Sequence, residues 1–189
     1  MPLDSVRSIA NTVTKYCTMT SQNIAGNITD FEQSISVNAS ADDIFEFLAD
    51  VKNVPQYLPT VKSAQRQQSD TVPGAQSDRI RTQGEVGNHS YDVDGHFRVM
   101  KEARHLKWGS DGENEYSGWM EVQPDGESRS QVFVHIHYAP RPEMLQRMAE
   151  RSPGGSFESA MNEGINKTLE SIKRICEGRG GKQEISANQ

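Results

Sequence analysis

The C-terminal part of the chain carries an apolar stripe that constrains the fold more than any other feature of the sequence. Its residues recur at steps of four, four, four, three and four: Phe157, Met161, Ile165, Leu169, Ile172 and Cys176. This spacing keeps them on one side of an α-helix of about six turns. Ser156 can cap the helix, Glu158 suits its first turn, and Gly178 can end it. The sequence therefore predicts a long amphipathic helix whose apolar side must be covered.

The segments before this helix alternate between apolar and polar residues, which is typical of β-strands. Phe31, Gln33, Ile35 and Val37 share one side of a first strand. Turn residues separate six more predicted strands, at 61–68, 77–87, 90–100, 104–109, 115–123 and 130–139. An antiparallel sheet of seven strands is too large to remain bare, and the long helix is the element that can cover it. The predicted fold class is α+β.

Two short helices are predicted between the first two strands. Asn38, Ser40 and Asp42 are candidate N-caps for the first helix. Helical spacing then relates Ile44, Phe45, Leu48 and Val51. Asn53 to Leu58 can form one or two further turns before Pro59 stops them.

Composition limits the class of protein to which the chain can belong. The isoelectric point of 5.4 and the scattered basic residues argue against a nucleic-acid-binding protein. We expect no stable membrane insertion, because no apolar run approaches the ~20 residues of a membrane span. Residues 1–26 also lack the features of a secretory signal. Two distant cysteines, Cys17 and Cys176, fit a reduced, cytoplasmic protein.

The length favours one domain, which we place at residues 29–178. Residues 1–28 are predicted to form a polar leader that is flexible or weakly helical. Residues 179–189 are predicted to be a disordered tail.

Five segments in the right order resemble one known family. They are Phe31–Leu48, Asn53–Pro59, Lys101–Trp108, Val122–Gly126 and Val132–Tyr138. The sequence from about residue 30 to 177 resembles the polyketide cyclase/dehydrase and lipid-transport proteins of the START-like, birch-pollen-allergen-like (SRPBCC) superfamily. The resemblance implies a helix-grip fold, in which a curved sheet wraps around the C-terminal helix and encloses a cavity for a hydrophobic ligand. It implies no shared reaction, because activity differs across the family.

Strand alternation predicts which residues face that cavity. The predicted ligand-binding residues are Tyr91, Val93, Phe97, Leu106, Trp108, Tyr116, Met120, Val134, Tyr138, Met161, Gly164 and Ile165. Such an apolar wall with a few hydroxyl groups suits a lipid-like or polycyclic ligand. The absent side chains of Gly95, Gly118 and Gly164 are interpreted as leaving room. The alternative is that most of these residues simply fill a core.

The same alternation places a second set of residues on the outer face. His135 and His137 point the same way there, but no third ligand is evident, and we expect no metal. Trp119 and Phe133 can form an exposed aromatic patch, a candidate homodimer contact. A solvated charge ladder is predicted for Asp92, Asp94, His96 and Arg98. If a bulge inverted the alternation, these four would instead form a polar pocket floor with an acid–base role.

Two functions are favoured at the level of the sequence, and a third, related to ubiquinone-binding or membrane-lipid-handling proteins, is suggested only by the segment Tyr57–Pro59. The first is a binding protein that holds a hydrophobic small molecule. The second is a polyketide cyclase or dehydratase that uses Tyr91, Tyr116 or Tyr138 as acid or base. The sequence has no nucleophile elbow and no phosphate-binding glycine loop, and we expect no cofactor. Residues 142–151 are predicted to form a short amphipathic helix, either a plain cover for the sheet or a lid.

Overall fold

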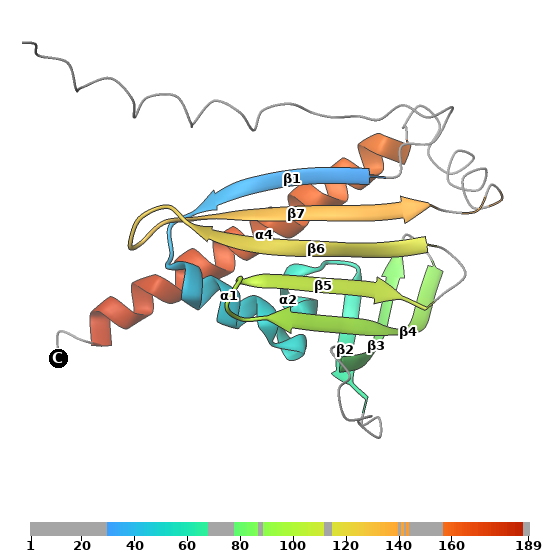
Figure 1. Cartoon of the computed structure of the whole chain (residues 1–189), viewed down its shortest axis with the longest axis horizontal. Helices are drawn as coiled ribbons and strands as arrows, with labels where there is room; N and C mark the ends of the chain where they lie inside the picture. The colour runs from blue at the N-terminus through green and yellow to red at the C-terminus, as the bar shows by residue number, and fades with distance from the viewer. Residues whose placement is uncertain are drawn as a thin grey trace, which may run out of the picture.

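The computed structural model describes residues 30–67, 78–86, 89–111, 115–139, 141, 143 and 157–186. The strands are β1 (Asp30–Val37), β2 (Val61–Arg66), β3 (Asp78–Val86), β4 (His89–Met100), β5 (His105–Ser110), β6 (Glu115–Pro124) and β7 (Ser130–Ala139). The helical segments are α1 (Ala41–Ala49), the 3-10 helix η1 (Val51–Asn53), α2 (Val54–Tyr57) and α4 (Phe157–Ser186). Within the described residues, the seven strands form one antiparallel sheet in the order β1-β7-β6-β5-β4-β3-β2. Helix α4 crosses one face of this sheet (Figure 1).

This architecture confirms the predicted α+β class and the helix-grip fold. Each predicted strand forms, with ends within two residues of the expected ones. No helix in the described ranges is both long and apolar enough to cross a membrane. The predicted leader lies outside the described residues, and so does the predicted helix over 142–151, except for Glu143.

Local capping explains why helices follow β1 so directly. Ser40 has an extended backbone, and its hydroxyl accepts a hydrogen bond from the Asp43 amide at 3.2 Å. Asp50 caps η1 in the same way by accepting from the Lys52 amide at 3.0 Å. These bonds satisfy amide groups that the first turn of a helix leaves unpaired. The side of α1 that packs into the core consists of Ile44, Phe45, Phe47 and Leu48.

The strands alternate between a concave face, which meets α4, and an outer face. In β4, Gly95 and Phe97 are buried, whereas Asp92 and Asp94 are exposed. The pairing of β4 with β3 and with β5 runs without a register shift. The alternation is therefore not inverted, and the hypothesis of a polar pocket floor is wrong for Asp92, Asp94, His96 and Arg98.

Helix α4 packs its predicted stripe against the concave face. Four residues of the stripe are at most 4% exposed: Ile165, Leu169, Ile172 and Cys176. Hydrogen bonds also join α4 to the edge strand β1. Gln33 Nε2 donates to Asn162 Oδ1 at 2.8 Å, and Lys173 Nζ donates to the Ser36 carbonyl at 2.6 Å. The apolar stripe and these polar contacts together fix the helix along the sheet.

The C-terminal end of α4 differs from the prediction. The helix continues to Ser186, so Gly178 does not end it, and the disordered tail over residues 179–189 stays a prediction. Gly178 does not adopt the positive φ of a left-handed helix cap, a conformation that the described chain shows at Arg104 and Gly126. Directly after it, the Arg179 guanidinium lies 4.1 Å from the centre of the Phe47 ring. This cation–π contact with α1 favours continuation of the helix.

Candidate ligand-binding site

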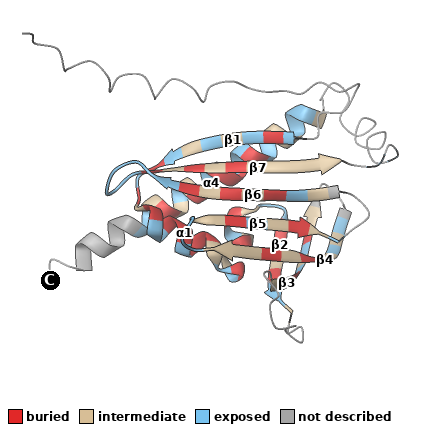
Figure 2. Cartoon of the chain, in the orientation of Figure 1, coloured by how far each residue is buried: buried red, intermediate tan, exposed pale blue. Residues whose placement is uncertain are grey.

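The concave face is covered unevenly from one end to the other. Buried residues gather on α1 and the strand segments beside it, whereas the far ends of β6 and β7 are only half-buried (Figure 2). Among the predicted binding residues, five are at most 4% exposed and belong to the hydrophobic core: Phe97, Leu106, Met120, Val134 and Ile165. Six others are half-buried: Tyr91, Val93, Trp108, Tyr116, Tyr138 and Met161. Large apolar side chains that face the helix and remain partly exposed offer surface that a ligand can cover.

Strand register places the half-buried aromatic residues side by side. Tyr116 of β6 lies opposite Tyr138 of β7, with their ring centres 5.9 Å apart in an edge-to-face arrangement. The ring of Tyr138 also lies 5.7 Å from the ring of Phe157, the first residue of α4. Trp108 of β5 lies opposite Gly118 of β6, next to this pair. We call Trp108, Tyr116, Tyr138 and Phe157 the aromatic cluster.

Phe157 is a candidate ligand contact that the sequence reasoning assigned only to the helical stripe. Its ring lies 5.7 Å from Phe31 and at the same centre-to-centre distance from Tyr138. The chain leaves β7 and enters α4 at this end of the sheet (Figure 1). The signal in the sequence was its position at the start of the stripe, four residues before Met161. Its proximity to the end of β7 follows only from the tertiary structure.

Two of the glycines interpreted as leaving room do not do so. A Cβ on Gly118 would lie 2.5 Å from Cζ2 of Trp108, because the indole already covers this position. A Cβ on Gly95 would lie 2.3 Å from the carbonyl oxygen of Gly109, so this glycine permits a close backbone approach. Gly164 is exposed and has open space around it. The space at Gly118 is therefore occupied by the protein itself.

The aromatic cluster carries neutral hydroxyl groups. Burial raises the pKa of Tyr116, and this effect is partly opposed by a hydrogen bond with the Trp108 side chain. Burial likewise raises the pKa of Tyr138. Both phenols therefore stay protonated at neutral pH and can donate or accept hydrogen bonds. Apolar rings with a few neutral hydroxyls suit a ligand that is mostly hydrophobic and carries one or two oxygen atoms.

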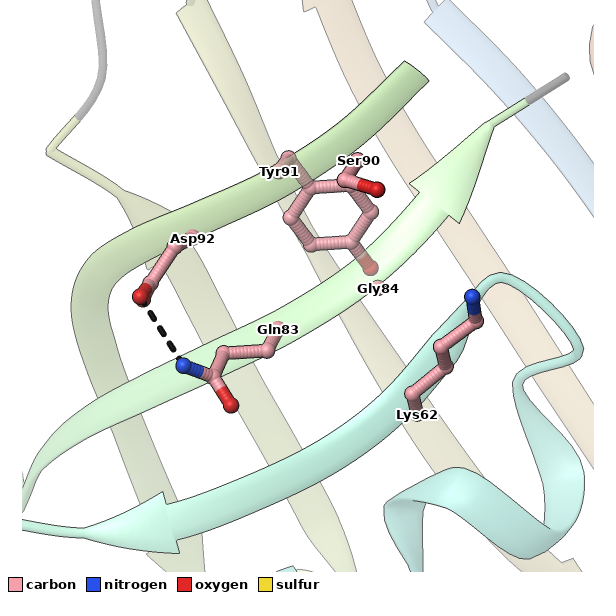
Figure 3. A pocket seen from close by; sticks show the side chains of 6 residues that line it. All are labelled: Lys62, Gln83, Gly84, Ser90, Tyr91 and Asp92. Carbon is pink, nitrogen blue, oxygen red and sulfur yellow. Dashed lines mark hydrogen bonds between the residues drawn. The ribbon is translucent and has the colours of Figure 1, made fainter. Parts of the chain in front are cut away.

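Tyr91 lies over Gly84 of β3 (Figure 3), and it is near enough to Tyr116 to contribute to the raised pKa of that residue. Its hydroxyl donates to the Thr60 carbonyl at 3.1 Å, and burial raises the pKa of Tyr91 while this hydrogen bond opposes the rise. A cleft of about 380 Å³ lies beside it, with polar walls from Lys62, Gln83, Ser90 and Asp92. The Gln83 amide donates to the Asp92 carboxylate at 2.9 Å. Because these neighbouring side chains are polar, Tyr91 is a poorer candidate for binding an apolar ligand than Tyr116 or Tyr138.

The outer face carries ion pairs and stacked rings. Arg81 donates two hydrogen bonds to Asp92, at 2.6 and 2.7 Å, and together with Gln83 holds the pKa of Asp92 down at about 2. His135 and His137 lie 3.4 and 3.0 Å from Oδ1 of Asp30. Even so, the described residues contain no group of three or more histidine, cysteine or acidic side chains arranged to hold a metal ion.

Trp119 on this face is stacked between two histidines. The ring centres of His105 and His135 lie 5.3 and 5.5 Å from the indole, with nearly parallel planes. Trp119 and Phe133 are both half-buried. The predicted exposed aromatic patch is therefore covered in part by imidazole rings, and a homodimer contact there stays a prediction.

The sequence matches one protein family over residues 29–177, the family described as Polyketide cyclase / dehydrase and lipid transport. The chain belongs to this family. The match spans every strand, the helices α1 and α2, and the part of α4 that faces the sheet. It therefore includes the whole of the aromatic cluster. The search of curated proteins gives no match.

Several solved structures share this fold. The Zhui aromatase/cyclase from Streptomyces sp. R1128 is 16% identical, with a TM-score of 0.62 over 79% of this chain and 94% of that one. A START superfamily protein from Mycobacterium smegmatis is 17% identical, with a TM-score of 0.58 over 82% and 99%. The di-domain ARO/CYC BexL, from the BE-7585A biosynthetic pathway, is 20% identical, with a TM-score of 0.58 over 77% of this chain. This chain spans 45% of BexL, less than half of its length. At these identities the likeness establishes the fold.

Proposed function

We propose that this family member binds a hydrophobic small molecule, lipid-like or polycyclic, against the aromatic cluster. The observation that carries the proposal is the uneven burial of the concave face. Leu106 is 1% exposed, whereas Trp108, two residues further along the same side of β5, is only half-buried. Tyr116, Tyr138 and Met161 are half-buried in the same way. A ligand that covers these side chains removes their exposed apolar surface from water, and this burial favours binding.

The chemistry of the cluster indicates what kind of ligand it suits. Aromatic side chains favour flat, apolar partners, which they contact by stacking or edge-to-face packing. The hydroxyls of Tyr116 and Tyr138, kept neutral by their raised pKa values, can hydrogen-bond to a carbonyl or hydroxyl of the ligand. Met161 on α4 adds a flexible side chain that adapts to varied shapes.

The alternative is a cyclase or dehydratase in which a cavity tyrosine acts as general acid. The observation that favours it is the polar interaction of the Trp108 side chain with Tyr116, which lowers the pKa of this phenol against the effect of burial. Burial, however, raises the pKa of Tyr116 and makes it a weaker acid. Among the described residues, no charged group lowers the pKa of Tyr116 or Tyr138 toward the range that proton transfer requires. We therefore rank binding above catalysis.

The proposal is tested with a neutral fluorescent probe, N-phenyl-1-naphthylamine, and two matched tryptophan variants. Trp108→Ala removes the indole on the concave face, whereas Trp119→Ala removes the indole on the outer face. We expect Trp108→Ala to weaken probe binding at least about tenfold, since it removes a large aromatic contact. Trp119→Ala should leave the affinity unchanged.

Mass spectrometry of an organic extract from the natively purified protein complements this comparison. A co-purifying hydrophobic molecule that is lost in Trp108→Ala and kept in Trp119→Ala would support the proposal. Equal probe affinity in the two variants, each shown to be folded by circular dichroism, would refute it. For the enzymatic alternative, Tyr116→Phe should abolish turnover of a substrate while keeping its affinity.

A further inference from the structure

The outer face of the sheet carries aromatic side chains, and none of the described helices covers it. The hydrophobic core joins α1, α2 and α4 to concave residues such as Leu106 and Val134, so these helices lie on the concave side (Figure 1). On the opposite face, Trp119 is half-buried between the stacked rings of His105 and His135. This stack therefore leaves aromatic surface that a protein partner can cover.

One row of residues crosses the outer face at the level of Trp119. Strand pairing places its members side by side on neighbouring strands: Arg98 on β4, Lys107 on β5, Trp119 on β6, His135 on β7 and Glu32 on β1. We call these five residues the central row. Because neighbouring strands lie about 4.8 Å apart, Arg98 and Glu32 lie roughly 10 Å to either side of Trp119. The central row is thus positive at one end, aromatic in the middle and negative at the other end.

The charges at the two ends of the central row are not neutralised within the described part of the chain. Among the described residues, no ion pair involves Arg98, Lys107 or Glu32. Other charges of the outer face are paired, as in the contact of Arg81 with Asp92. Two cations at one end and one carboxylate at the other therefore remain available to a partner of complementary charge.

The central row is complementary to itself in one arrangement of two copies. Copies that pack face to face are related by a two-fold axis in the plane between them. If the axis ran across the strands, each Arg98 would face the other Arg98, and each Glu32 the other Glu32. If the axis runs along β6, the second copy presents the row in reverse order, so Arg98 faces Glu32. Lys107 then faces His135, and Trp119 faces its own counterpart. Charge therefore favours the axis along β6 and opposes the axis across the strands.

We propose that a second copy of this chain packs against the outer face, with the two-fold axis along β6 at Trp119. The two indoles form the centre of the interface, and two ion pairs of Arg98 with Glu32 flank it. The sheet curves around α4 and therefore away from the second copy, so the contact is confined to the central strands. Small interfaces of this kind give weak, reversible dimers. Both aromatic clusters face away from the interface, so the dimer forms whether or not a ligand is bound.

Sedimentation velocity measures this self-association over a series of protein concentrations. The wild type should pass from monomer to dimer, with a dissociation constant above about 1 µM. Arg98→Glu replaces attraction by repulsion at two symmetric places and should weaken the dimer at least about tenfold, and Glu32→Arg should do the same. The two changes together reverse both ends of the central row and should restore the dimer. Arg174→Glu, the same change of charge at an exposed position of α4, is the matched control and should have no effect.

Single cysteines test the position of the axis. Ser117 on β6 and Ser34 on β1 are both exposed on the outer face. An axis along β6 brings Ser117 against its own counterpart and keeps the two copies of Ser34 apart. The background chain carries Cys17→Ser and keeps Cys176, which is buried. In this background, Ser117→Cys should form a disulfide-linked dimer under air oxidation, whereas Ser34→Cys should not.

The outcomes separate this interface from any other surface of the chain. Trp119→Ala, which removes the centre of the interface, should weaken the dimer, whereas Trp108→Ala on the concave face should not. Circular dichroism shows that each variant is folded. A chain that stays monomeric at every concentration would overturn the proposal. So would a dimer in which Arg98→Glu has no more effect than Arg174→Glu, and so would equal cross-linking of the two cysteine variants.

Discussion

Substitution of Gly118 by alanine tests quantitatively how tightly Trp108 packs on the concave face. In Gly118→Ala the new Cβ would lie 2.5 Å from Cζ2 and 2.8 Å from Cε2 of the indole. It would also lie 2.6 Å from the carbonyl oxygen of His135 on β7. The indole edge must retreat by about 0.9 Å to reach an ordinary contact of 3.4 Å. We therefore expect the indole to move toward α4.

The size of the effect follows from two opposing contributions. Overpacking of this kind destabilises a folded protein by about 1–3 kcal/mol. Replacing glycine by alanine within a strand raises the free energy of unfolding by about 0.5–1 kcal/mol, because alanine lowers the conformational entropy of the unfolded chain. The free energy of unfolding should thus fall by up to about 2.5 kcal/mol. One part of this loss comes from the steric clash of the new Cβ with the indole, and the other part comes from its clash with the backbone of β7.

A double-mutant cycle separates the two parts. Urea denaturation followed by circular dichroism gives the free energy of unfolding of the wild type, Gly118→Ala, Trp108→Ala and the double variant. Removing the indole should relieve about 1 kcal/mol of the Gly118→Ala penalty, and the rest should persist because of the His135 carbonyl. If the two changes are additive within about 0.3 kcal/mol, the indole does not cover Gly118 in solution, and the reasoning fails.

Two further predictions concern buried polar groups. The Ser130 hydroxyl is fully buried and donates to the Ala39 carbonyl at 2.9 Å, so Ser130→Ala should lower the free energy of unfolding by about 1–2 kcal/mol. Urea denaturation at pH 7, with exposed Ser36→Ala as the control, measures this loss; equal effects would contradict it. Burial raises the pKa of Tyr57, so the stability it confers is complete below the unfolded pKa of about 10 and is lost as the pH rises above that value. Tyr57→Phe should make the alkaline loss of stability shallower between about pH 9 and 11.5. Identical pH profiles for the variant and the wild type would refute this linkage.

Periodicity predicted most of the fold because it is a local property of the chain. Alternation along β4 assigned Phe97 to the concave face and Asp92 to the outer face, and both assignments are confirmed. Steps of three and four residues from Phe157 to Cys176 likewise identified the helix that covers the sheet. The resemblance of five segments then led to the family, because their order follows the order of the elements.

The sequence by itself determined which face each side chain occupies, and the tertiary structure decided how fully each is covered. Leu106 and Trp108 share one side of β5 and differ in burial, because Leu106 lies within the hydrophobic core and Trp108 packs against its border. Covering depends on which elements meet across the sheet, and no local pattern encodes that. For the same reason the sequence could not show that the indole fills the space above Gly118. Nor could it show that Arg179 stacks on Phe47 beyond Gly178, because both contacts join residues distant along the chain.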